Sequence, residues 1–185
     1  MQYNNKNIAE LVIKDLFDYD NGETVYKKIL EIFTGAYESK EANDWGLNHN
    51  RENIDALQSI EQLTNFLDNE VRNAELKTKD YNAVDFDAEY AAMIQSVDSN
   101  SIKKFLKIWF ERNSAIKIAD KLLEMFNAHI HAKKGTKKDI FDLACDGFQV
   151  RLFINGILKL EQSVVDFTDE SFCFAMPGYS PIYLS

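Results

Sequence analysis

The sequence predicts an α+β fold, in which a predominantly α-helical N-terminal part is followed by a small C-terminal antiparallel β-sheet. Two observations carry this prediction. Apolar residues recur every three or four positions through most of residues 1–135, which is the period of a helix with one buried face. From Phe148 onward apolar residues alternate along the chain, and the pair Asn155-Gly156 follows, which is typical of a tight hairpin turn.

Six helices are expected within residues 1–135, each marked by a stripe of apolar residues at helical spacing. Asn7 and Glu10 resemble a capping box at the start of the first helix, and Asp87 is placed to cap the fourth. A turn is expected at Asn21-Gly22, between the first two helices. The expected ranges are about 7–18, 25–36, 57–74, 90–97, 102–110 and 115–130.

Residues 136–185 are expected to form three or four antiparallel strands. The clearest pair runs over 148–154 and 157–160, with Asp146-Gly147 marking an earlier turn and residues 171–175 a further strand. A sheet of this size is not stable alone, so its apolar face needs the helices as a cover. At 185 residues the chain suits one domain, and both parts are therefore expected to pack as one compact unit.

The net charge is −9, and the charge is distributed unevenly along the chain. Residues 1–102 carry 20 acidic and 9 basic side chains, whereas residues 103–138 carry 10 basic and only 3 acidic ones. Such asymmetry indicates that electrostatic attraction to a partner is part of the function, although pairing of the two regions within the fold would also explain it.

The leading hypothesis is a non-enzymatic, acidic protein-interaction module. Carboxylates on a helical surface would imitate a nucleic-acid backbone and would bind, and thereby inhibit, a basic partner that handles nucleic acid. A phage or mobile-element antagonist is one protein of this type. The expected contacts are Asp80, Asp85, Asp87 and Glu89, joined by Asp18, Asp20 and Glu23.

The alternative is a nucleic-acid-binding protein or nuclease that acts through the basic strip of residues 103–138. Its candidate residues are Lys103, Lys104, Lys107, Lys133, Lys134, His129 and His131. Arg112 is the only arginine in the strip, which counts against base readout, because bidentate recognition favours arginine. A third hypothesis is homo-oligomerisation, with the basic strip of one subunit facing acidic residues of another.

The sequence lacks the motifs that mark several kinds of binding site. There is no phosphate-binding glycine loop and no zinc-binding spacing of cysteine and histidine, so no cofactor and no metal is expected. His129 and His131 would share one face only in an extended segment, and in a helix they diverge. The sequence has no run of apolar residues long enough to cross a membrane, so a cytoplasmic location is expected.

Overall fold

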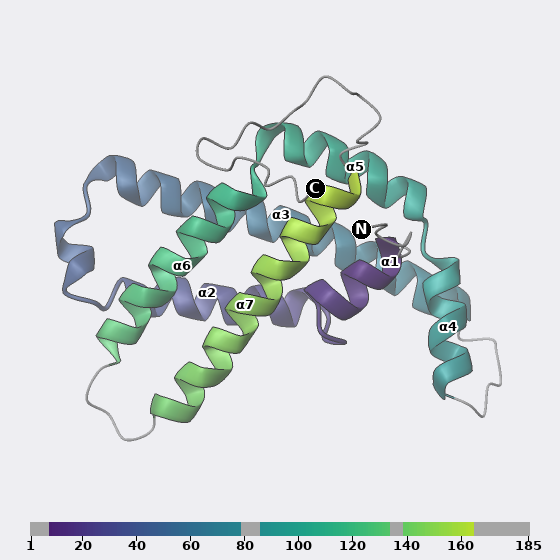
Figure 1. Ribbon diagram of the computed structural model, residues 1–185, viewed down its shortest axis with the longest axis horizontal. Coiled ribbons are helices and arrows are strands. Elements are labelled where there is room, and N and C mark those ends of the chain that lie inside the picture. The colour runs from purple at the N-terminus through teal and green to yellow at the C-terminus, as the bar shows by residue number, and fades with distance from the viewer. Residues whose placement is uncertain (1–7, 79–85, 134–138, 165–185) are drawn as a thin grey trace, which may run out of the picture.

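The computed structural model describes residues 8–78, 86–133 and 139–164, and every regular element in these ranges is helical (Figure 1). The first helix, α1, continues directly as the π-helical segment η1. The elements are α1 (Ile8–Glu10), η1 (Leu11–Leu16), α2 (Gly22–Ala36), η2 (Glu41–Asp44), α3 (Leu47–Thr78), α4 (Phe86–Ser96), α5 (Ser99–Arg112), α6 (Ala115–Ala132) and α7 (Asp139–Val164).

The prediction of an α+β fold with a C-terminal sheet is wrong, because residues 139–164 form the single helix α7. Its buried apolar residues follow a helical period of three and four positions. They are Val150, Phe153, Ile157 and Leu160. The apparent alternation over 148–154 arises because α7 is apolar on two sides: Val150 lies on the side packed against other helices, whereas Phe148 is 54% exposed on the outer side. The strand predicted over 171–175 lies outside the described residues.

Gly156 and Gly147, which the sequence pattern placed in turns, lie inside α7. A Cβ atom added to Gly156 would lie 2.8 Å from the Cα of Leu16 in η1. A Cβ atom added to Gly147 would lie 2.9 Å from the Cζ of Phe126 in α6. Both glycines therefore allow a neighbouring helix to approach more closely than a residue with a side chain would. The Asn155-Gly156 pair marks a helix crossing and not a hairpin.

All six predicted helices are present in the first two described ranges, with some differences at their ends. The Asn21 side chain accepts a 2.8 Å hydrogen bond from the Thr24 amide and so caps α2. Asp98, which the sequence analysis did not single out, caps α5 by accepting from the amides of Asn100 and Ser101. Helix α3 begins at Leu47, well before the predicted start, because its first turns are too polar to show a stripe.

The helices share one apolar core that joins both ends of the described chain. Helix α7 crosses the centre of the view in Figure 1, with η1 packed along its C-terminal half. Helix α6 runs antiparallel beside α7, since the Ala115 amide at its start donates to Glu161 and Phe126 lies against Gly147. On the far side of the core, Phe66 of α3 stacks on Phe105 of α5 with ring centroids 3.8 Å apart. Within the described ranges, no helix combines the length and apolar character that a membrane crossing requires.

We predict that Gly156→Ala lowers the free energy of unfolding by about 1–3 kcal/mol, because the added methyl group collides with the backbone of η1. Urea denaturation measures the change. Gly46→Ala is the matched control, since a Cβ atom there meets nothing within 4 Å. A gain in stability of about 1 kcal/mol, which alanine normally gives over glycine in a helix, would contradict the close contact.

Candidate functional site

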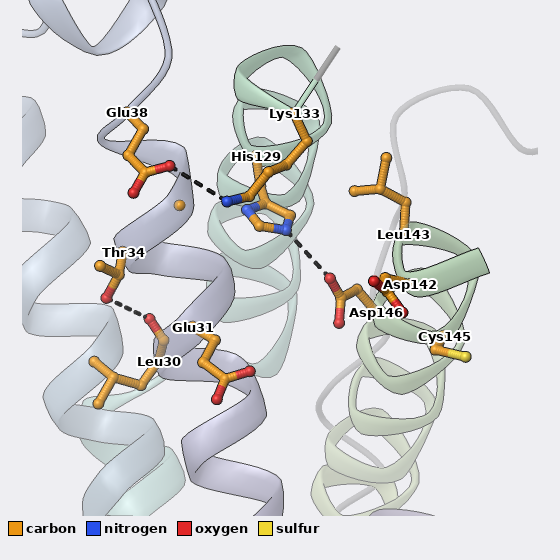
Figure 2. Close-up of a pocket in the computed structure, with 11 residues that line it drawn as sticks. Leu30, Glu31, Thr34, Glu38, His129, Lys133, Asp142, Leu143, Cys145 and Asp146 are labelled. Atoms are coloured by element: carbon orange, nitrogen blue, oxygen red, sulfur yellow. Dashed lines mark hydrogen bonds and ion pairs between the residues drawn. The ribbon is translucent and has the colours of Figure 1, made fainter. Parts of the chain in front are cut away.

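An open cavity of about 660 Å³ lies between α2, α6 and the N-terminal half of α7. Helix α2 and the turn after it form one wall, α7 forms the other, and the C-terminal end of α6 lies between them (Figure 2). Ionisable side chains dominate the lining, together with Leu30 on α2 and Leu143 on α7. These ionisable residues are Glu31, Glu38, His129, Lys133, Asp142, Cys145 and Asp146.

His129 is the buried centre of this site, with only 5% of its surface exposed. Its Nε2 lies 3.2 Å from Oδ2 of Asp146, so the pair joins α6 to α7. Its Nδ1 is buried without a hydrogen-bond partner and faces Gly35 of α2, where an added Cβ atom would lie only 2.0 Å away. The imidazole can occupy this position only because residue 35 has no side chain.

The carboxylates of the cavity outnumber its cationic groups. Lys133 lies 3.4 Å from Oε2 of Glu38, and His129 contacts Asp146. Glu31 on α2 and Asp142 on α7 are exposed and have no ion-pair partner among the described residues. In Figure 2, Glu31 and Asp146 project from opposite walls toward the same space. The cavity therefore presents a negative potential to a ligand that enters it.

The groups in the cavity do not form an activated nucleophile. Cys145 is exposed, and Figure 2 shows its side chain pointing away from His129. Both ring nitrogens of His129 are directed elsewhere, one at Asp146 and one at Gly35. No group of three or more His, Cys, Asp or Glu side chains within the described ranges is placed to hold a metal ion. The arrangement instead suits the binding of a cationic group.

The predicted acidic contacts at the start of the chain are largely occupied by partners within the fold. Lys27 lies 2.7 Å from Glu23, whose other oxygen contacts Arg72 at 3.3 Å. The hydrogen bond from Lys27, together with Arg72, lowers the pKa of Glu23 below its ordinary value. Asp20 is paired with Lys28 at 2.7 Å. These two carboxylates are therefore less available to an external partner than the sequence suggested.

Asp18 adopts a left-handed backbone conformation (φ 50°) in the turn after η1. It has no ion pair with any other described residue. The remaining predicted contacts cannot be placed in a common surface: Asp80 and Asp85 lie outside the described residues, and Asp87 and Glu89 lie in α4, where only their backbone is described. Glu31 and Asp142, the cavity acids that have no ion pair with another described residue, were not among the predicted contacts.

The predicted basic strip divides into parts with different surroundings. Lys103, Lys104 and Lys107 lie exposed on the outer face of α5 and have no ion-pair partner in the part of the chain that the structure describes. Lys121, by contrast, contacts Glu52 and Glu124. Burial lowers the pKa of Lys121, but hydrogen bonds to Glu124 and Glu52 outweigh that effect and leave it raised. The strip is thus not one continuous free surface.

The end of the strip lies at the candidate cavity. Helix α6 continues through Ala132, so His129 and His131 point in different directions, with His129 buried and His131 exposed beside Glu41. Lys133 lines the cavity, and Lys134 lies outside the described residues. The structure therefore brings His129 and Lys133 together but separates both from the lysines of α5, which lie toward the opposite end of α7 (Figure 1).

Most residues of the cavity were not predicted from the sequence, although some of them recur at a helical spacing that the sequence shows. Glu31 and Gly35 lie four residues apart on one side of α2, with Glu38 in the turn after it, and Asp142 and Asp146 have the same spacing on α7. The second spacing was hidden because residues 139–164 were predicted as strands and turns. The crossing that brings α2 next to α7 has no sequence signal of this kind.

Comparison of the chain with protein-family models, with curated proteins and with solved structures found no match.

We predict that Gly35→Ala destabilises the fold by about 1–3 kcal/mol and that most of this cost disappears in the background of His129→Ala, which removes the ring that the methyl group would meet. Urea denaturation of the parent, both single variants and the double variant measures the coupling. Additive effects would contradict the packing of the imidazole on Gly35.

Proposed function

We propose that the chain is a non-enzymatic interaction module that binds a basic protein partner, and that the cavity between α2, α6 and α7 receives cationic side chains of that partner. The observation that carries the proposal is the pair Glu31 and Asp142. These acids lie on opposite walls of one cavity and have no ion-pair partner among the described residues.

The chemistry of the walls favours arginine or lysine over a small inorganic cation. A long cationic side chain would place its charged end among Glu31, Asp142 and Asp146 while its methylene groups contact Leu30 and Leu143. A guanidinium group would gain more than an ammonium group, because its fixed fork of donors can bind two carboxylates at once.

Inhibition would follow if the partner uses the same cationic side chains to bind nucleic acid. Carboxylates in the cavity would then compete with phosphates for those side chains, and salt would weaken both interactions. The acidic character of the sequence suggested one specific case of this proposal. In that case the chain is an antagonist of a nucleic-acid-handling protein, of the kind that phages and mobile elements direct at their hosts.

We predict that Glu31→Gln combined with Asp142→Asn weakens the binding of an oligoarginine peptide by about fivefold or more at low salt, because two attractive charges are lost. Isothermal titration calorimetry at two salt concentrations gives both the affinity and its salt dependence. The matched control is Glu111→Gln with Asp120→Asn, which removes two exposed acids outside the cavity.

Equal losses in the cavity variant and in the control would mean that only net charge matters, and the proposed site would be wrong. No binding by the parent protein would also contradict the proposal.

A second candidate function is binding of a nucleic acid through α5. The observation that favours it is the cluster of Lys103, Lys104 and Lys107 within two turns of one helix face, exposed and without ion pairs to other described residues. Like charges at such spacing repel one another and cost stability, which a polyanion bound across them would offset.

We predict for this candidate that changing Lys103, Lys104 and Lys107 to alanine reduces the salt slope of binding to single-stranded RNA, because fewer counterions are released. Fluorescence anisotropy at several salt concentrations measures the slope. Lys27→Ala with Lys28→Ala is the control, since these lysines are already paired within the fold. A parent protein whose binding does not depend on salt would contradict this candidate.

A further inference from the structure

The N-terminal half of α7 exposes an apolar stripe on its outer side, next to the cavity. The stripe consists of Phe141, Cys145, Phe148 and Leu152, which follow one another at intervals of four, three and four residues. Phe141 is 77% exposed and Phe148 is 54% exposed, and Ile140 beside them is 83% exposed. Phenylalanines exposed to this degree on a structured helix mark a surface that binds another molecule more often than isolated apolar residues do.

The stripe and the cavity are continuous. Cys145 belongs to both, because it lines the cavity and lies one helical turn from Phe141 and from Phe148. Asp142 follows Phe141 directly and also lines the cavity. Leu30 continues the apolar surface across the cavity onto α2. A partner seated on this side of the protein would therefore meet a row of apolar groups beside a row of carboxylates.

We infer that the partner of this site presents an amphipathic helix with one apolar and one basic face, and that the helix lies along α7 with its basic side over Glu31, Asp142 and Asp146. This inference rests on the proposed function and adds the form of the partner to it. Docking of an amphipathic helix against an apolar surface is a common mode of peptide recognition, and the charge of the cavity selects a basic helix.

The dimensions of the stripe fit this occupant. From Phe141 to Leu152 the helix rises about 16 Å, which corresponds to about three turns of a partner helix. The period of the stripe also matches a helical partner, since apolar residues at intervals of three and four form the seam along which two helices pack. An extended basic peptide would match the charges of the cavity but not this row of apolar side chains.

Two other exposed apolar residues lie away from the cavity. Ile108 on α5 and Ile116 on α6 are about half exposed, but neither is beside the cavity carboxylates Glu31, Asp142 and Asp146. They would not attract a basic helix, and they therefore provide matched controls for the loss of exposed apolar surface.

The test uses three synthetic peptides of about 14 residues, long enough to cover the stripe. The first places leucines at helical spacing with lysines elsewhere, the second has the same composition in an order without that spacing, and the third replaces every leucine with serine. We expect the full chain to bind the first peptide at least about tenfold more tightly than the second. The far-ultraviolet circular dichroism of the mixture should also show a gain of helix over the separate components.

Variants of the protein locate the contact. Phe141→Ser with Phe148→Ser should weaken binding of the first peptide about tenfold or more and leave the serine peptide unaffected, whereas Ile108→Ser with Ile116→Ser should change neither. Equal binding of all three peptides would overturn the inference while leaving the proposed function intact. No binding of any basic peptide would overturn both.

Light scattering of the protein alone tests the competing occupant, a second copy of this chain. A dimer that Phe141→Ser converts to a monomer would show that the stripe serves self-association, and the inference would be wrong. A monomer that binds the first peptide at a ratio of one to one would support it.

Discussion

The packing of α7 depends on two glycines that let another element lie directly on its backbone. Gly156 allows contact with the backbone of η1, and Gly147 receives the ring of Phe126 from α6. The contact at Gly156 joins α7 to the N-terminal helical segment, and the ion pair between Asp15 and Lys159 at 3.1 Å adds to it. A methyl group added at either glycine would require the neighbouring element or α7 to shift, because the interior is closely packed.

How far the sequence predicted the fold depended on how many sides of each helix are buried. Helices α2, α5 and α6 have one apolar and one polar face, and their caps at Asn21 and near Asp98 lie where the periodicity begins. Helix α7 packs against four other elements and also carries exposed apolar residues such as Phe148 on its outer side, so its apolar residues lie at too many positions to show one period. Its glycines then appeared to be turn residues, although they mark the crossings. Local patterns carry information about a single element and its solvent-exposed face, and they carry little about which elements touch.

The same limit explains why the candidate site was only partly predicted. The sequence alone does not show whether a carboxylate is free to contact another protein or is already paired within the fold. Glu23, for example, contacts Arg72 on another helix. Buried Asp68 also has its partners within the fold, because it accepts a 2.7 Å hydrogen bond from the Gly22 amide and contacts Arg72 at 2.6 Å. Internal pairing of this kind occupies Asp20 and Glu23, two of the acids predicted to contact a partner. What remains free is decided by tertiary structure, and it leaves a negative cavity beside α7 and a positive face on α5.

The contact between η1 and α7 has a consequence for the synthesis of the protein. Leu11, Val12 and Leu16 leave the ribosome well before the residues of α7 that cover them, because more than a hundred residues lie between η1 and α7. At roughly 5–20 residues per second, the apolar N-terminal turns wait for many seconds without their partner. During that time they are a binding site for chaperones and a place where nascent chains can aggregate. The core that η1 and α7 share cannot form before α7 has been synthesised, so the yield of the protein in a cell depends on what protects η1 until then.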